Sequence, residues 1–215
     1  MKELEAKNQF ALATAKLLFG KGLDLVFIGG TALNAFYLNY RYSEDLDLAY
    51  FKKEKRDEVV IFLIEQGYVV NREEQNFRYT ISFQGSTIKM DILHYEEKYN
   101  GTDGKELDGI LVKTLKIEEF FVEKLISFFT REDRIGLGRD AYDLFSIEQK
   151  YHFTLELTKK AKTNIKNNIV SLDHNLGVLE ANKKQIEDAM TPYLRNQIKI
   201  DLVIRFIKKL QGALK

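Results

Sequence analysis

The sequence has no cysteine, a single proline and no long apolar run, and these absences exclude several classes of protein. Without cysteine the chain can form no disulfide bond, no cysteine-ligated zinc site and no thiol nucleophile. No apolar stretch approaches the roughly 20 residues that a membrane-spanning helix needs. The first residues also lack the apolar segment of a signal peptide, because charged and polar residues precede the small residues Ala11, Ala13 and Ala15. We therefore expect a cytoplasmic protein with no membrane partner.

The net charge of +1 conceals an uneven distribution of charged residues along the chain. Residues 151–215 contain 12 Lys and Arg against 6 Asp and Glu, whereas residues 1–150 contain 21 against 26. An acidic first part and a basic second part are compatible with a metal site beside a surface that binds a polyanion. Charge alone favours the simpler interpretation, a basic and solvated helical surface.

The spacing of apolar residues changes near residue 115. Before it, short apolar or alternating stretches predict strands at 23–28, 45–51, 77–83, 87–94 and 110–114. Helices are predicted at 2–19, 32–40 and 53–66, and the polar stretch 96–108 is predicted to be a loop. After it, only helices are predicted, at 117–130, 139–149, 153–168, 171–188 and from Pro192 to about Leu210, with a loop at 131–138. We expect an α+β protein with two domains, 1–115 and 116–215.

One predicted strand carries two acidic residues, Asp45 and Asp47, separated by Leu46. Because side chains alternate along a strand, both carboxylates point to one face, while Leu46 and Leu48 point to the other. Two carboxylates on one face repel each other unless a cation lies between them. Mg²⁺ prefers oxygen ligands and is the usual ion of phosphoryl-transfer sites, so the pair predicts a magnesium site.

A third acidic residue, Asp91, lies on the second strand of a predicted hairpin whose turn is Gln84-Gly85-Ser86. If that strand lies beside the one with Asp45 and Asp47, three carboxylates converge, as they do in two-metal nucleotidyl transfer. Asp91 would then be a third metal ligand or the group that activates the attacking hydroxyl. Taken alone, Asp91 is also compatible with a plain charge at a strand edge.

The segment Gly29-Gly30-Thr31 precedes the two acids and is expected to form a turn before a helix, with Thr31 as the helix cap. Exposed amides at a helix start favour an anion such as a phosphate, and glycine lets a ligand approach the backbone closely. A plain strand-to-helix turn is at least as compatible with two glycines. The Asp-x-Asp pair 14 residues beyond Thr31 makes nucleotide binding the stronger interpretation.

Within the predicted helix at 117–130, Lys124 lies on one stripe with Phe120 and Phe128, four residues to either side. A lysine on an apolar stripe needs an anion or a route to solvent. Lys124 therefore either extends into solvent at a domain junction or binds a phosphate of a nucleotide.

A second charged group, Arg139, Asp140 and Asp143, follows shortly after that helix. Asp140 and Asp143 are three residues apart and so are neighbours on a helix surface. The group either braces a helix end, orients Lys124 or binds the substrate.

Two stretches together resemble one known family. FIGGTALNAFYLNYRYSEDLDLAY, residues 27–50, resembles the first motif of nucleotidyltransferase-like toxins of the AbiEii/AbiGii type, a branch of the polymerase-β-like nucleotidyltransferase superfamily. VEKLISFFTREDRIGLGRDAYDLFSI, residues 122–147, resembles the later motif of that family, a helix with a Lys-Leu pair, a basic loop and then Arg-Asp-x-x-Asp. The resemblance covers roughly residues 24–150, and both motifs in this order are specific to the family.

The resemblance implies a minimal nucleotidyltransferase core with a mixed sheet, followed by a helical bundle, and the use of an NTP with Mg²⁺. By position, it assigns Asp45 and Asp47 to the metal, Gly29 and Gly30 to the triphosphate turn, Lys124 to the motif lysine, and Arg139, Asp140 and Asp143 to the downstream cluster. Members of this family act as toxins of toxin–antitoxin or phage-defence systems. Some are similar to enzymes that add nucleotides to the 3′ end of tRNA.

We therefore predict a Mg²⁺-dependent enzyme that transfers NMP from an NTP to a hydroxyl acceptor. The expected acceptor is RNA, with the 3′ end of tRNA first, and an antitoxin protein is the expected partner. Asp45 and Asp47 would hold the metal, and Gly29, Gly30 and Thr31 would contact the triphosphate.

Two other functions stay open at this point. One is a small-molecule nucleotidyltransferase of the antibiotic-modifying kind. The other is a catalytically silent module that binds a nucleotide or a protein partner. The intact acids argue against the silent module, because like charges on one face are costly to keep without a metal.

Overall fold

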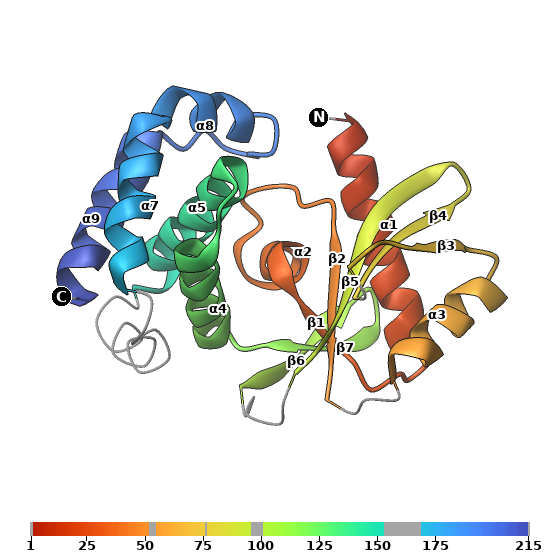
Figure 1. Cartoon of the computed structure of the whole chain (residues 1–215). Coiled ribbons are helices and arrows are strands. Elements are labelled where there is room, and N and C mark those ends of the chain that lie inside the picture. Colours follow the sequence, from red (N-terminus) through yellow and green to blue (C-terminus); the bar gives the residue numbers. More distant parts are fainter. Residues whose placement is uncertain (1, 52–54, 76, 96–100, 153–168, 215) are drawn as a thin grey trace. The chain divides into compact units, whose positions relative to one another are not determined.

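The computed structural model describes residues 2–51, 55–75, 77–95, 101–152 and 169–214. The chain divides into two compact units, Met1–Lys116 and Ile117–Lys215. The first unit contains a mixed β-sheet with helices, and the described part of the second unit is helical (Figure 1). The expected α+β class, with a mixed-sheet core followed by a helical bundle, is confirmed.

The first unit is built on a seven-stranded sheet with the strand order β3-β4-β5-β2-β1-β7-β6. The strands are β1 (Val26–Ile28), β2 (Leu46–Tyr50), β3 (Val69–Arg72), β4 (Arg78–Phe83), β5 (Ser86–His94), β6 (Thr102–Leu107) and β7 (Ile110–Leu115). β2 runs parallel to β5, and β1 runs parallel to β7, whereas the other neighbours are antiparallel. The strand β2 therefore lies at the centre of the sheet, between β1 and β5.

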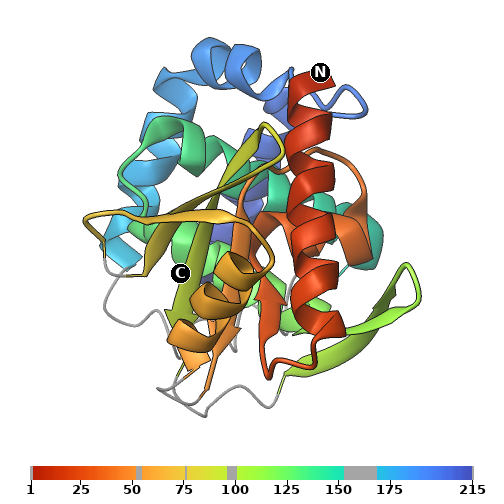
Figure 2. The ribbon, with the colours of Figure 1, turned by 90° about the vertical axis from the view of Figure 1, so that its right-hand side faces the viewer.

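The apolar side chains of the central strands form part of the core of the first unit. Leu46 and Leu48 of β2 are fully buried and pair in register with the buried Met90 and Ile92 of β5. The helices of this unit are α1 (Lys2–Gly20), α2 (Gly29–Leu33), the π-helical η1 (Asn34–Leu38) and α3 (Lys55–Glu65). Figures 1 and 2 show α1 and α3 on the same face of the sheet. The leucine side of β2 is thus buried, as the alternation predicted.

The polar stretch 96–108 is not a loop throughout, because its described part contains the strand β6. β6 and β7 form a hairpin in which Leu107 pairs with Ile110. The two turn residues, Asp108 and Gly109, have φ angles of 46° and 82°, which suit the two-residue Asp-Gly turn of a hairpin. Strand β6 lies at the edge of the sheet, so it can be polar on both faces and escape detection by apolar alternation.

The described helices of the second unit are α4 (Ile117–Thr130), α5 (Arg134–Tyr151), α7 (Ile169–Ala181), α8 (Lys183–Met190) and α9 (Ile200–Leu214). Helix α4 has the predicted bounds. The predicted helix at 153–168 lies outside the described residues. Among the described helices, none combines the length and hydropathy that crossing a membrane requires.

Three predictions for the second unit are wrong. The single helix predicted at 171–188 is divided at Asn182 into α7 and α8. Helix α5 begins at Arg134 rather than 139, because the side chain of Asp133 accepts a hydrogen bond of 2.6 Å from the backbone N–H of Gly136 and caps the helix there. Pro192 does not open the last helix, since α9 starts only at Ile200. Proline has no N–H to continue the hydrogen bonding of α8, so it follows the end of that helix instead.

Candidate active site

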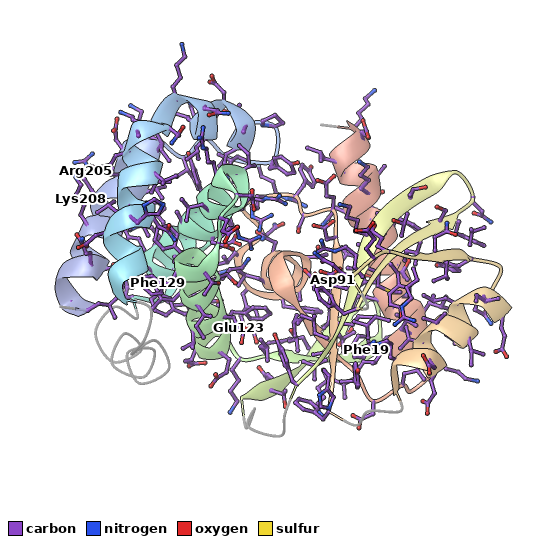
Figure 3. All side chains as sticks on the ribbon, in the orientation of Figure 1. Phe19, Asp91, Glu123, Phe129, Arg205 and Lys208 are labelled. Atoms are coloured by element: carbon purple, nitrogen blue, oxygen red, sulfur yellow. The ribbon has the colours of Figure 1, made fainter. Side chains whose placement is uncertain are left out.

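Three acidic residues come together on the central strands of the sheet. Asp47 of β2 and Asp91 of β5 are direct partners in the parallel ladder. Partners in register share a face and lie about 4.8 Å apart between strands. Asp45 directly precedes the first residue of β2, two residues from Asp47. Asp45 and Asp47 are half-buried, and Figure 3 labels Asp91 on the sheet. The strand pairing on which the convergence of the three carboxylates depended is therefore present.

Gly29 lies against the carboxylate of Asp47. The ladder between β1 and β2 pairs Ile28 with Asp47, so the residue after Ile28 leaves the sheet beside that side chain. A Cβ atom on Gly29 would lie 1.9 Å from Oδ2 of Asp47, and the φ angle of Gly29 is +72°. Both facts require glycine here, since only glycine lacks the Cβ atom and adopts this φ without strain. The start of α2 is thereby fixed next to the acids.

Gly30 and Thr31 do not form the turn and the helix cap that the sequence predicted. Both glycines belong to the first turn of α2, and Ile28 is the residue at its N-cap, so the separate turn and the Thr31 cap were wrong. The buried hydroxyl of Thr31 instead donates a hydrogen bond of 2.5 Å to the backbone carbonyl of Asp45. Thr31 therefore anchors the backbone that carries the first acid. Its expected role in phosphate binding stays a prediction.

Arg41 is a buried cation that sequence reasoning missed. Its side chain is only 3% exposed, and its guanidinium donates hydrogen bonds to the hydroxyl of Tyr40 and the carbonyl of Tyr42. Nη2 of Arg41 would lie 2.6 Å from a Cβ atom on Gly30, so the guanidinium packs against the glycine backbone. The available signal was a lone arginine among tyrosines, four residues before Asp45. Arg41 ties the end of the helical segment to the approach to β2.

Arg78 is a second cation that was not predicted, and it binds Asp91. The two residues are partners across β4 and β5. Nε of Arg78 donates to Oδ1 of Asp91 at 2.8 Å, and Nη2 donates to Oδ2 at 2.7 Å. These hydrogen bonds raise the pKa of Arg78 above its ordinary value, and the negative charges of Asp91, Glu73 and Asp45 act in the same direction. Arg78 thus holds both oxygens of the third acid.

The acid face, formed by Asp45, Asp47 and Asp91, offers carboxylate oxygens to a metal ion. In the part of the chain that the structure describes, no group of three or more His, Cys, Asp or Glu side chains is arranged to hold one. Asp91 is engaged by Arg78. Asp45 and Asp47 present half-buried carboxylates on one face, and carboxylate oxygens are the ligands that Mg²⁺ prefers. The chemistry of this pair fits one divalent cation, with further ligands coming from water or phosphate.

In the helical unit, Lys124 lies between two buried carboxylates. Its Nζ is 3.1 Å from Oδ1 of Asp140 and 2.9 Å from Oδ2 of Asp143. Nε of Arg131 donates to the other oxygen of Asp140 at 2.8 Å. Asp140 and Asp143 are 1% and 0% exposed, so two cations neutralise two carboxylates away from water. Of the alternatives for this cluster, the one in which it orients Lys124 agrees with these contacts.

The predicted cluster is not complete, because Arg139 is not in it. The guanidinium of Arg139 lies 5.9 Å from the ring centre of Tyr193, at the distance of a cation–π contact. Arg131 takes the place that the sequence pattern gave to Arg139. Arg131 lies directly after the end of α4, in the stretch predicted to be a loop, so helical spacing gave no signal for its contact with Asp140. Nucleotide binding by Lys124, Arg139, Asp140 and Asp143 stays a prediction.

Comparison with protein families gives one match that covers most of the chain. The model of a family described as "Nucleotidyl transferase AbiEii toxin, Type IV TA system" matches residues 12–199. Both stretches on which the resemblance rested lie inside that range. A search of curated proteins finds no match to this sequence.

Solved structures with the same fold include two proteins of low sequence identity. JHP933 from Helicobacter pylori is 22% identical with a TM-score of 0.55, and the alignment covers 100% of this chain and 94% of that one. An antigenic nucleotidyltransferase-like protein from Paracoccidioides brasiliensis is 18% identical with a TM-score of 0.53, with 80% of this chain and 92% of that chain covered. At these identities the likeness extends to the fold, and it agrees with the sheet and helices described above.

Proposed function

Because this chain belongs to the AbiEii family of nucleotidyltransferase toxins, we propose that it transfers NMP from an NTP to a hydroxyl group of RNA in a Mg²⁺-dependent reaction. The observation that carries the proposal is Asp47 on β2 with Asp45 directly before that strand, and with the backbone of Gly29 against Asp47. A pair of carboxylates that can hold Mg²⁺ is what a metal-bound triphosphate needs, and the missing Cβ of Gly29 leaves room for the carboxylate of Asp47.

The reaction forms one phosphoester bond and breaks one phosphoanhydride bond. The acceptor oxygen attacks the α-phosphorus, the bond from that phosphorus to the bridging oxygen of the β-phosphate breaks, and pyrophosphate leaves with the electron pair. The proton of the hydroxyl passes to a nearby carboxylate or water. A bound Mg²⁺ supplies charge neutralisation for the phosphates. Asp45 and Asp47 would hold that ion, while Thr31 fixes the backbone of Asp45 and Arg41 fixes the segment before it.

The acceptor that we propose is RNA, and the 3′ end of tRNA is the first candidate. The excess of basic residues in 151–215 supports a polyanionic acceptor, because Lys and Arg neutralise the phosphates of a nucleic acid. An AbiEii toxin would act within a toxin–antitoxin or phage-defence system, and we propose an antitoxin protein as the partner of this chain. A small aminoglycoside-like acceptor would not need the basic excess.

A labelling experiment tests this function. The wild-type protein is incubated with each of the four α-³²P-labelled NTPs, total RNA and Mg²⁺, and the products are separated on a denaturing gel. We expect label from one preferred NTP in a band of tRNA size, with none after addition of EDTA. Label in a small molecule only, when a cell extract is supplied, would favour the antibiotic-modifying alternative. No label in any fraction, together with NTP binding in calorimetry, would favour a silent binding module.

A further inference from the structure

Arg78 lies beside the acids on the same face of the sheet. Going across the strands from β2 through β5 to β4, the ladder places Asp47, Asp91 and Arg78 side by side in register. Residues in register share one face of a sheet, and neighbouring strands are about 4.8 Å apart, so the Cα atoms of Asp47 and Arg78 are about 10 Å apart. Arg78 therefore lies on the same face as Asp47 and Asp91, one strand beyond Asp91.

Both oxygens of Asp91 are occupied by this cation. The two hydrogen bonds from Nε and Nη2, at 2.8 and 2.7 Å, form the paired geometry in which a guanidinium fork binds a carboxylate most strongly. A divalent cation on the same oxygens would lie within a few ångströms of the guanidinium charge and be repelled by it. The side chain of Asp91 is 14% exposed, so solvent screens this repulsion little.

Arg78 adds a fixed positive charge to this group of acids. The negative charges of Asp91, Glu73 and Asp45 all act on its guanidinium. Because Arg78 already neutralises one of these carboxylates, the group needs one added positive charge fewer than the acids alone would need.

We propose that Arg78 takes the place of a second metal ion, so that this chain binds one divalent cation, on Asp45 and Asp47. Asp91 is then a positioning residue that holds Arg78, in place of the metal-ligand or general-base role expected from the sequence. The guanidinium has five N–H groups, and those that do not contact Asp91 are donors for a phosphate oxygen of the NTP. The side chain of Arg78 is 32% exposed, which leaves it accessible to a ligand. The proposal rests on the nucleotidyltransferase site described under the proposed function.

The number of bound ions tests this proposal without measuring activity. Mn²⁺ replaces Mg²⁺, and the electron paramagnetic resonance signal of free Mn²⁺ is followed while the ion is titrated into the protein with no nucleotide. We expect one site in the wild type. Arg78→Gln frees Asp91 and removes one positive charge, so we expect two sites. The matched control Arg72→Gln removes an exposed arginine from β3 and should keep one site.

A charge-neutral double variant separates a metal ligand from a positioning residue. Arg78→Gln/Asp91→Asn removes one positive and one negative charge together, so the net charge of the face is unchanged. We expect one site with a dissociation constant within about threefold of the wild type. Removal of a metal ligand would instead lower the affinity much further, because the ion loses one of its carboxylate oxygens. Circular dichroism shows whether each variant is folded. If Arg78→Gln alone does not fold, the Mn²⁺ dissociation constant of the double variant tests the proposal.

Several results would overturn the proposal. Two sites in the wild type, one site in folded Arg78→Gln, or a tenfold loss of affinity in the double variant each contradict it while leaving the nucleotidyltransferase function intact. No site in the wild type, with the same result for Asp45→Asn/Asp47→Asn, contradicts both this proposal and the metal site of the proposed function.

Discussion

Gly29 and Asp47 occupy adjoining positions with no space for another atom between them. A Cβ atom on Gly29 would lie 1.9 Å from Oδ2 of Asp47 and 2.7 Å from its Cβ. The pairing of Ile28 with Asp47 across β1 and β2 creates this approach, and the φ angle of +72° at Gly29 turns the chain into α2. The backbone at the start of α2 and the carboxylate proposed to hold the metal are thus positioned by each other.

Replacing Gly29 by alanine should abolish most of the activity. The new methyl group would displace the carboxylate of Asp47, and an L-residue at this φ costs about 1–3 kcal/mol. The control is Gly85→Ala, where φ is +83° but no atom lies within 4 Å of the added Cβ. Nucleotide transfer and thermal unfolding are measured for both variants. We expect both to lose stability and only Gly29→Ala to lose transfer by tenfold or more, which is about 1.4 kcal/mol in barrier. Equal activity of the two variants would contradict the assigned role of Asp47.

Replacing Thr31 by valine should weaken the support of Asp45. The buried hydroxyl donates to the backbone carbonyl of Asp45, and valine has the same shape without the donor. Loss of the hydrogen bond and the unpaired carbonyl should cost about 1–3 kcal/mol of unfolding free energy. Urea unfolding and the Mn²⁺ dissociation constant are measured together. Thr87→Val, which alters an exposed hydroxyl contact with Ser82, serves as the control and should change neither value. A wild-type Mn²⁺ affinity in folded Thr31→Val would show that this bond does not position Asp45.

Alternation along the chain was enough to predict the acid face. Period-two alternation puts Asp45 and Asp47 opposite the buried Leu46 and Leu48 wherever the strand lies. The helix at 117–130 was equally clear, because its apolar stripe is long and regular. Local patterns of this kind depend only on neighbouring residues, and they were sufficient for the fold class.

The partner of Asp91 depends on the register between β4 and β5. The turn predicted from the sequence shifts this register by one residue. The turn predicted at Gln84-Gly85-Ser86 has three residues, whereas the structure pairs Phe83 with Ser86 and leaves only two in the turn. The shorter turn puts Arg78 opposite Asp91, and the longer one would have put Ile92 there. For Lys124, the sequence left open whether Asp140 and Asp143 orient it, and only the packing of α4 and α5 shows its contact with Asp143.

Removing the charge of Lys124 should destabilise the helical unit strongly. Lys124→Met leaves Asp140 and Asp143 buried with one cation fewer, and loss of one partner from a buried ion pair costs about 3–5 kcal/mol. The control Lys208→Met removes an exposed lysine that pairs with Glu180, worth less than about 1 kcal/mol. Chemical denaturation gives the free energy of unfolding of both variants. The double variant Lys124→Met/Asp143→Asn should regain part of the loss, because it also removes one buried negative charge. A loss below about 1 kcal/mol for Lys124→Met would contradict the network described here.

Tyr142 should make the protein less stable at alkaline pH. Burial raises the pKa of its hydroxyl above the ordinary value, and the negative charge of Glu187 adds to the shift. The folded state then holds this proton more tightly than the unfolded state. Protonated Tyr142 therefore stabilises the fold below pH about 10, and this stabilisation falls as the pH rises above it. Unfolding free energies of the wild type and Tyr142→Phe are compared between pH 8 and 11. We expect a smaller decline in Tyr142→Phe, with Tyr151→Phe as control. Parallel curves for the wild type and Tyr142→Phe would contradict the raised pKa.

The central claim is that Asp45 and Asp47 carry metal-dependent nucleotide transfer, and the transfer rate in acid variants tests it most directly. Incorporation of α-³²P-labelled NMP into tRNA is timed for the wild type, Asp45→Asn, Asp47→Asn and Asp24→Asn over a range of Mg²⁺ concentrations. Asp24 is an exposed acid outside the acid face, 53% accessible, and its loss should leave the rate unchanged. We predict that both acid-face variants lose at least 100-fold in rate, roughly 2.7 kcal/mol, and that higher Mg²⁺ does not restore it. Wild-type rates in Asp45→Asn and Asp47→Asn, with both proteins folded, would contradict the account.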